Sequence, residues 1–345
     1  MKIECPHCHK RYRIKDEKLP VGQKIAFPCP ACRRSIDLDL RNAPQPGATP
    51  VETVAAAVDP EAAGRLKTEL LHQWENLPPM LEVLVKARRL LDDPKASLKR
   101  VAGVIEADPA LAASLLKIAN SAFYGLSGNV SSVQHAAVVL GRKTLEEVIT
   151  MAGTSEFLGK ELPGYGLAAG DLWRHSLTVA IASRQLALKK MPKLENDAFS
   201  AGLFHDLGRI ILDPYILLEK AQLERRVNEG GRHPVVAEKE VFGFDHADLT
   251  ADLCQNWNFP PAQFLAIKHH HAPSGSDGDM LSHIVHVADA ADAGIFGSGN
   301  TGIGPPLLED SALSFVNIDE KELAELMTES AEAVEQITGA VLSAQ

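Results

Sequence analysis

The fold is decided by the stretch Ala198-Phe-Ser-Ala-Gly-Leu-Phe-His-Asp-Leu-Gly-Arg-Ile-Ile-Leu212. Its apolar residues predict a buried helix over 195–207, which presents His205 and Asp206 at adjacent positions and breaks at Gly208. Two neighbouring polar side chains inside a buried helix are costly to desolvate unless they have partners. The stretch therefore predicts either a metal ion or a tight hydrogen-bond network at this point.

The size and composition of the chain indicate a helical protein. Its 345 residues fit two or three domains, and a hydrophobic fraction of 45% with only 5% aromatic residues is typical of aliphatic, Ala/Leu-rich helical chains. No apolar run approaches the roughly 18 residues that a membrane helix requires. The N-terminus, Met1-Lys-Ile-Glu-Cys5, lacks the apolar core of a signal peptide. We therefore expect a cytoplasmic protein without membrane contact.

The charge is unevenly distributed along the chain. Residues 1–40 carry nine Lys/Arg and five Asp/Glu, a net +4, so the remaining residues hold 26 basic and 40 acidic side chains, a net −14. A basic head and an acidic body indicate two separate units. The acidic body argues against binding nucleic acid over its surface, because that binding depends on neutralising phosphates.

Four of the five cysteines form two C-x-x-C motifs near the N-terminus, Cys5-Pro-His-Cys8 and Cys29-Pro-Ala-Cys32. Two such turns bring four thiolates together, so residues 1–40 are predicted to be a zinc ribbon with a closed, structural Zn²⁺ site. The segment also resembles the short N-terminal ribbon of many bacterial regulatory proteins. Its basic side chains leave open a contact with nucleic acid or with an acidic protein, although a solvated face is the commoner meaning.

A proline-rich linker is predicted over residues 41–60, and helical patterns continue from there to the C-terminus. Residues 61–165 form a predicted helical lobe with N-caps at Ser97 and Asp108. Residues 166–295 form a second lobe, in which one helix is expected over 215–228. Residues 307–345 add a C-terminal helical extension, so the fold class expected for residues 61–345 is all-α.

The second lobe carries a series of metal-ligand side chains on successive predicted helices: His175, His205, Asp206, His246, His270, His271 and Asp289. Imidazole and carboxylate ligands suit iron, manganese or zinc. Two neighbouring cations would activate a water molecule and hold a phosphoryl oxygen. A hydrogen-bonded polar core without metal is the alternative.

This order of residues resembles the HD superfamily of metal-dependent phosphohydrolases. The resemblance implies that His175, His205, Asp206 and Asp289 bind one divalent metal and that His246, His270 and His271 can hold a second. Where cyclic-dinucleotide-cleaving relatives have a lysine that contacts phosphate, this chain has Arg209. If the protein is an enzyme, Asp206 and Arg209 are the predicted catalytic residues.

The first lobe resembles a more specific family. Its motifs are Leu77-Pro-Pro-Met80, Ile105-Glu-Ala-Asp-Pro-Ala-Leu111, Leu116-Lys-Ile-Ala-Asn-Ser-Ala-Phe-Tyr-Gly125 and Ser132-Val-Gln-His-Ala-Ala-Val-Val-Leu-Gly141. They resemble the HDOD family, the HD-related output domain of bacterial signalling. The resemblance implies a two-lobed all-α fold whose second lobe is HD-like, preceded here by the ribbon.

Two functions remain open on this basis. The first is a signalling protein that binds a divalent metal and acts through a protein partner, with the ribbon as its docking or sensing head. The second is a metal-dependent phosphohydrolase, a phosphodiesterase acting on a nucleotide or cyclic nucleotide. A third possibility is that the ribbon itself binds nucleic acid.

Overall fold

The protein is described here by a computed structural model. It describes residues 2–4, 11–13, 24–28, 32, 35–39, 59–74, 79–126, 128–228, 232–296 and 307–342. The chain divides into two compact units, Met1–Ala57 and Val58–Gln345, and each is treated by itself.

The N-terminal unit contains two short antiparallel hairpins. Strand β1 (Lys2–Glu4) pairs with β2 (Arg11–Arg13), and β3 (Lys24–Pro28) pairs with β4 (Ser35–Asp39). Of the predicted zinc ligands, Cys32 is half-buried, whereas Cys5, Cys8 and Cys29 lie outside the described residues. The predicted linker also lies outside them, apart from its last two residues.

The second unit is helical throughout its described residues. Its α-helices are α1 (Pro60–Gln73), α2 (Pro79–Asp92), α3 (Leu98–Glu106), α4 (Pro109–Ala119), α5 (Val133–Leu158), α6 (Asp171–Lys190), α7 (Glu195–Phe204), α8 (Gly208–Leu218), α9 (Lys220–Asn228), α10 (Pro234–Phe242), α11 (His246–Asn256), α12 (Pro261–His269), α13 (Met280–Phe296), α14 (Ala312–Val316) and α15 (Glu320–Leu342). Short 3₁₀ turns occupy Ala122–Tyr124, Pro192–Leu194 and Pro273–Ser276. The all-α expectation for this unit is confirmed. None of the described helices combines the length and apolarity needed to cross a bilayer.

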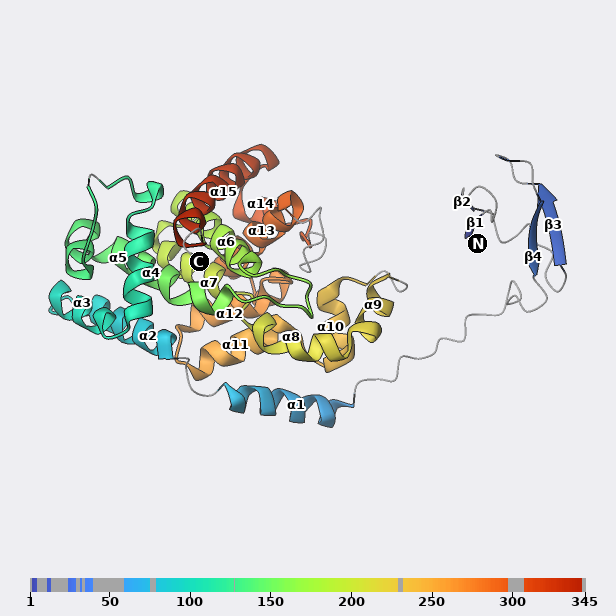
Figure 1. Ribbon diagram of the computed structural model, residues 1–345, viewed down its shortest axis with the longest axis horizontal. Helices are drawn as coiled ribbons and strands as arrows, with labels where there is room; N and C mark the ends of the chain where they lie inside the picture. Colours follow the sequence, from blue (N-terminus) through green and yellow to red (C-terminus); the bar gives the residue numbers. More distant parts are fainter. Residues whose placement is uncertain are drawn as a thin grey trace. The chain divides into compact units, whose positions relative to one another are not determined.

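The first lobe is built by α2 to α5, which lie together at one end of the unit (Figure 1). Two caps expected from the sequence are present, because the Ser97 side chain accepts from Arg100 N and the Asp108 carboxylate accepts from Ala110 N and Leu111 N. The N-terminal ends of α3 and α4 are therefore set by the local sequence. Gly141 interrupts α5 with φ of 71°, a left-handed conformation that favours glycine.

The second lobe is centred on α6 and α7, which pack against each other more extensively than any other pair of helices described. Helices α12 and α13 cover α7, and α11 packs on α8 and α12. Close packing of α7 on α6 depends on Gly202, where a Cβ would lie 2.9 Å from Ala180 Cα. This arrangement brings the ends of several helices to one place.

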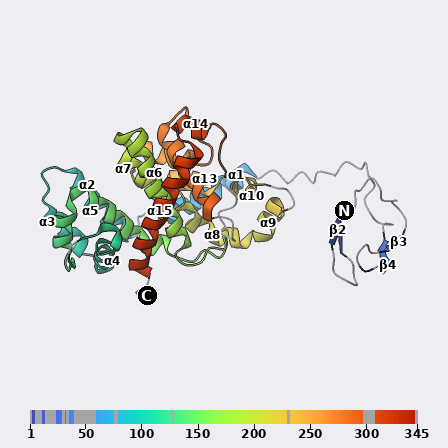
Figure 2. The same ribbon diagram turned by 90° about the horizontal axis from the view of Figure 1, so that it is seen from above.

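Two regions differ from the sequence prediction. The single helix expected over 215–228 is wrong: α8 starts at Gly208 and continues through Pro214, and a break at Glu219 separates it from α9. Buried Ile211, Leu212 and Ile216 stabilise α8 despite the proline. The helical extension expected over 307–345 is divided into the short α14 and the long α15. Helix α1 packs on α11 of the second lobe (Figure 1), and α15 contacts both α4 and α6 (Figure 2).

Candidate metal centre

The candidate centre lies where helices of the second lobe end or face one another. His175 is on the buried face of α6, and His205 with Asp206 forms the turn between α7 and α8. His246 is the first residue of α11, whose start is fixed by a capping box between Asp245 and Asp248. The remaining ligands come from the end of α12 and from α13: His270, His271 and Asp289.

Gly208 allows the α7–α8 turn to approach α11. Its N–H donates to Thr250 Oγ1 at 2.8 Å, and a Cβ at this position would lie only 2.3 Å from the His246 carbonyl oxygen. No side chain fits at that distance. The glycine in the His-Asp-Leu-Gly sequence therefore sets the spacing between Asp206 and His246.

The first cluster joins four ligand atoms. His175 Nε2 lies 3.2 Å from His205 Nε2, 3.5 Å from Asp206 Oδ2 and 3.3 Å from Asp289 Oδ1. His205 Nε2 lies 3.5 Å from Asp206 Oδ2 and 3.6 Å from Asp289 Oδ1. Two atoms that each bind one metal at about 2.1 Å are roughly 3.0–3.4 Å apart in octahedral or tetrahedral geometry. The five separations, 3.2–3.6 Å, are close to this range, so these side chains could hold a divalent cation.

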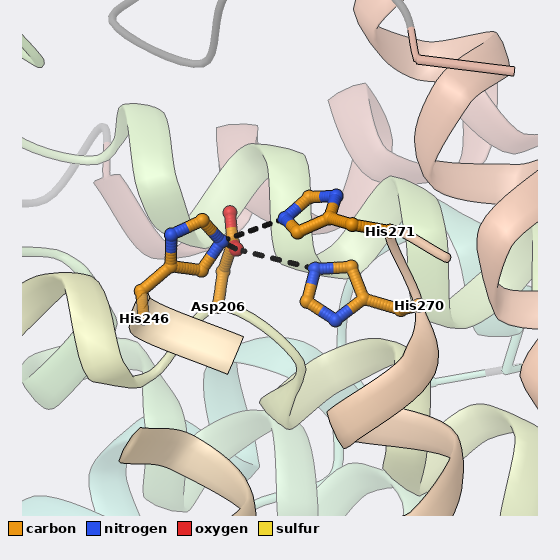
Figure 3. A group of neighbouring side chains, drawn as sticks. All are labelled: Asp206, His246, His270 and His271. Atoms are coloured by element: carbon orange, nitrogen blue, oxygen red, sulfur yellow. Dashed lines mark hydrogen bonds and ion pairs between the residues drawn. The ribbon is translucent and has the colours of Figure 1, made fainter. Parts of the chain in front are cut away.

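The second cluster uses the other oxygen of Asp206. Asp206 Oδ1 is 3.0 Å from His246 Nε2 and 3.9 Å from His270 Nε2, and His271 Nε2 is 2.9 Å from His246 Nε2 (Figure 3). All four residues offer ligand atoms within 4.8 Å of one another. Asp206 thus faces one cluster with each carboxylate oxygen, and it could contribute a ligand atom to both.

The outward ring nitrogens of four histidines are occupied by other partners. The Nδ1–H of His175 donates to Asp292 Oδ2, and that of His246 donates to Glu238 Oε2. The Nδ1–H groups of His205 and His270 donate to backbone carbonyls, those of Gly202 and Ile267. These bonds leave Nε2 of each ring pointing into the centre, where it carries the lone pair that binds metal when the ring is neutral. Within the described residues, His270 Nε2 is buried and has no hydrogen-bond partner. A buried nitrogen lone pair aimed into the cluster is available to bind a metal ion.

The carboxylates of the centre are ionised by their surroundings. Burial alone would raise the pKa of Asp206, but the Arg209 guanidinium and the His205 and His246 rings hold it well below its usual range. Burial likewise opposes ionisation of Asp289, whose pKa is nevertheless kept well below its usual range, chiefly by hydrogen bonds with His175 and His205. Two buried anions therefore face the imidazoles.

The surroundings shift the pKa values of the histidines in opposite directions. Burial and the neighbouring His205 ring lower the pKa of His270 to about 3, and burial with the His270 ring lowers that of His271. Burial would also lower the pKa of His175, but hydrogen bonds with three aspartates raise it well above its usual range. His270 and His271 are thus neutral at physiological pH, the form that binds metal.

Arg209 lies behind Asp206 and is 1% exposed. Its Nε is 2.7 Å from Asp206 Oδ2, and its guanidinium carbon lies 5.1 Å from the centre of the Tyr165 ring. This placement favours a role in orienting the Asp206 carboxylate.

All seven ligands predicted in the second lobe come together in one buried region. Sequence reasoning missed Asp292 and Glu238, which hold His175 and His246. Asp292 follows Asp289 by three residues on α13 and so shares its helix face, a signal that could have found it. Glu238 carries no comparable signal, because its role depends on how α10 packs. His283 and His286 lie outside the two clusters and donate to backbone carbonyls of Asp279 and His270.

Two family models match the chain. The HDOD domain model matches residues 77–273, more than half of the sequence, and the zinc-ribbon domain model matches residues 1–37. A protein of Treponema pallidum (strain Nichols) that carries no functional name is 24% identical over 213 residues. The match covers 60% of this chain and only 40% of that protein.

Solved structures share the helical fold. An HDOD domain protein of unknown function from Geobacter sulfurreducens has a TM-score of 0.63 at 22% identity, covering 81% of this chain and 99% of its own. A Shewanella amazonensis SB2B protein provisionally named a phosphohydrolase has a TM-score of 0.60 at 23% identity, covering 82% and 99%. A Marinobacter aquaeolei VT8 protein provisionally named a signal transduction protein has a TM-score of 0.59 at 22% identity, covering 81% and 66%.

Proposed function

The chain belongs to the HDOD domain family, and we propose that it is a bacterial regulatory protein whose helical unit binds two divalent metal ions. One observation carries the proposal: Asp206 faces a separate buried cluster with each of its oxygens, 3.5 Å from His175 Nε2 and 3.0 Å from His246 Nε2. Buried polar groups at this density are costly unless they share a cation or a complete hydrogen-bond network.

In this proposal the metal ions hold the helix ends in one arrangement. The protein then signals by contacting a protein partner in that arrangement. The ions would supply charge that joins α6, the α7–α8 turn, α11, α12 and α13. The chain's own residues orient the ligands: Asp292 holds His175, Glu238 holds His246 and Arg209 holds Asp206. The zinc ribbon is the proposed docking or sensing head.

The test is metal content by mass spectrometry, with manganese, iron or zinc supplied separately to the full chain and to a chain that starts at residue 58. We expect up to two equivalents in the helical unit beyond the ribbon zinc. Asp206→Ala should remove both, because it contributes to both clusters. His175→Gln should weaken the first site only, and His246→Gln the second only.

His283→Gln provides the matched control, because His283 is a buried histidine of the same lobe outside both clusters. It should keep full metal content. If the chain from residue 58 bound none of the three metals while remaining folded, the clusters would be hydrogen-bonded polar cores and the proposal would fail.

A second candidate function is a phosphodiesterase acting on a nucleotide or cyclic nucleotide. It is favoured by the complete ligand set, and a structural relative is provisionally named a phosphohydrolase. Two cations bound here would supply Lewis-acid activation of a water molecule and of a phosphoryl oxygen. Asp206, oriented by Arg209, would fix their separation, and the neutral His270 and His271 rings would stay available as ligands.

Hydrolysis of bis(p-nitrophenyl) phosphate tests this candidate. Release of p-nitrophenol by the metal-loaded chain should be lost in Asp206→Ala and kept in His283→Gln. A protein that holds two metals yet releases no product from this diester or from cyclic nucleotides would leave the regulatory function standing and exclude hydrolysis of these substrates.

A further inference from the structure

A cavity of about 370 Å³ lies beside the candidate metal centre. Helices α8, α9 and α10 and the turn at 164–166 surround it. Its apolar wall includes Ile216 from α8 and Leu223 with Val227 from α9. Leu223 and Val227 are four residues apart, so one face of α9 lines the cavity.

The floor of the cavity is polar and buried. Tyr165 is 8% exposed and Glu238 is 2% exposed, and both line the cavity. The Tyr165 hydroxyl donates to Glu238 Oε1 at 3.1 Å, while Glu238 Oε2 accepts from His246 N at 2.9 Å and from His246 Nδ1 at 2.8 Å. The tyrosine proton is therefore already used, and the floor offers acceptor lone pairs to an occupant.

The rim carries charges of both signs. Lys220 and Glu224 line the cavity from α9 and are exposed. Because a cation and an anion lie at the same rim, the rim itself favours neither a cationic nor an anionic ligand. A neutral ligand suits this cavity if its apolar part contacts the wall and one hydrogen-bond donor reaches the floor.

The floor is also the support of the metal centre. Glu238 touches the cavity on one side and holds His246 on the other, and His246 Nε2 lies 3.0 Å from Asp206 Oδ1. An occupant that donates to Glu238 competes with the His246 ring for the same carboxylate. Its presence is therefore communicated to His246 through a single side chain.

We propose that this cavity binds a small neutral molecule with an apolar body and a hydroxyl or N–H donor, and that Glu238 relays its binding to His246. The regulatory meaning of the relay rests on the proposed function, since His246 is one of the ligands of the second cluster. Binding itself does not depend on it.

Benzyl alcohol and anisole are suitable probes, because they are isomers and only the alcohol can donate a hydrogen bond. Methyl NMR of the full chain should show benzyl alcohol shifting the signals of Ile216, Leu223 and Val227, with a dissociation constant on the order of a millimolar for so small a ligand. Anisole should bind about fivefold more weakly, because it has no proton to donate to the remaining acceptor lone pairs of the floor. The ring signals of His246 should shift with the alcohol, with or without added metal.

Val227→Trp should fill the cavity and abolish the methyl and His246 shifts. Leu218→Trp adds the same side chain at a position that is 80% exposed on α8 and does not line the cavity, so it should keep them. The comparison of the two isomers needs no variant and tests the donor requirement alone.

Absence of methyl shifts at a benzyl alcohol concentration about 20-fold above the expected dissociation constant would overturn the site. Equal affinity for the two isomers would overturn the donor requirement. Methyl shifts without a His246 response would overturn the relay. A chain that bound no metal but showed all three effects would retain the cavity and its relay while the proposed function failed.

Discussion

His246 lies between two carboxylates, and its charge state is set by them. Burial and the Arg209 guanidinium each lower its pKa, but Glu238 and Asp206 outweigh them and raise it to about 9. In the metal-free protein this ring is therefore protonated at neutral pH. Metal binding at its Nε2 must displace that proton, so the second site should bind metal more weakly as the pH falls.

This raised pKa predicts how the stability of the metal-free helical unit depends on pH. The stabilisation from protonated His246 is fully present below the unfolded pKa of 6.5 and is lost as the pH rises through about 9. We expect the free energy of unfolding to fall by up to about 3 kcal/mol over this range. Urea unfolding of the chain from residue 58, kept metal-free with chelator, measures the fall.

His246→Gln is the comparison for that experiment. It should show a smaller fall over the same pH range, and the residual dependence is attributed to His175, whose pKa is also raised. His270, with its pKa lowered to about 3, acts on stability below pH 6.5 and not in this window. Identical pH profiles for the variant and the original chain would contradict the assignment.

At the residue scale, the ligands could be predicted because metal chemistry restricts them to few residue types. Histidine and aspartate recur at helix ends along the second lobe, and the His205-Asp206 pair in an apolar helix marks the centre. Their supporting residues could not all be predicted in this way. Glu238 is one of many glutamates in the chain, and only the turn that joins α10 to α11 brings it to His246.

At the scale of single elements, Arg142 closes the C-terminal end of α2. Its guanidinium donates to four carbonyl oxygens, of Leu90 at 3.1 Å, Leu91 at 2.7 Å, Asp93 at 3.2 Å and Ala96 at 2.6 Å. The carbonyls of Leu90 and Leu91 are among those that the end of α2 leaves without intrahelical partners, and the carbonyls of Asp93 and Ala96 belong to the loop that follows. One side chain of α5 thus fixes both the end of α2 and the loop that follows it.

Arg142→Met should therefore destabilise the first lobe by about 2–3 kcal/mol, because several acceptors lose a charged donor at once. Equilibrium urea unfolding gives the value. Lys143→Met is the matched neighbour: Lys143 pairs with Glu195 while its side chain is 58% exposed, so its loss should cost less than about 1 kcal/mol. Equal costs for the two variants would show that Arg142 acts merely as a surface charge.

Gly208 gives an equally sharp prediction for the α7–α8 turn. A methyl group there would lie 2.3 Å from the His246 carbonyl oxygen and 2.8 Å from Thr250 Oγ1, so Gly208→Ala must push α11 away from the turn. We expect a loss of at least about 2 kcal/mol and weaker metal binding at the second cluster, measured by unfolding and by metal content.

Gly103→Ala is the control for this substitution. Gly103 lies within α3, and a Cβ there meets nothing within 4 Å, so alanine should stabilise the unit by up to about 1 kcal/mol. The prediction for the turn fails if Gly208→Ala is as well tolerated as Gly103→Ala.

The elements could be predicted where local chemistry determines their ends. Ser97 and Asp108 cap α3 and α4 as expected, because a capping oxygen acts on its own first turn. The prediction failed at Tyr215, where a helix was expected to begin, because α8 already starts at Gly208 and Pro214 lies inside it. There the burial of Ile211, Leu212 and Ile216 outweighs the missing backbone hydrogen bond, a balance that depends on tertiary packing.

At the scale of the whole molecule, helix α15 joins parts of the helical unit that are distant in sequence. Its amphipathic pattern predicted a terminal helix, and α15 indeed covers Glu320–Leu342. Buried Leu326, Met327, Val334 and Ile337 form its apolar face. The pattern shows that this face must be covered, but not that α4, α6 and α13 are the helices that cover it.

The division into two compact units predicts that the ribbon and the helical unit lose their metals independently. Cys29→Ser should remove about one zinc per chain, because a closed four-thiolate site cannot spare a ligand. The metal content and unfolding midpoint of the helical unit should not change. Its three tryptophans, Trp74, Trp173 and Trp257, are all the tryptophans of the chain, so their fluorescence reports the unfolding of that unit alone.

Cys254→Ser is the reciprocal control, because Cys254 is fully buried in α11. It should keep the ribbon zinc and lower the tryptophan-monitored stability by about 1 kcal/mol, since a hydroxyl replaces a buried thiol. A lower unfolding midpoint in Cys29→Ser would mean that the ribbon stabilises the helical unit. The ribbon would then act on the metal centre through the fold itself, and not as a separately folded head.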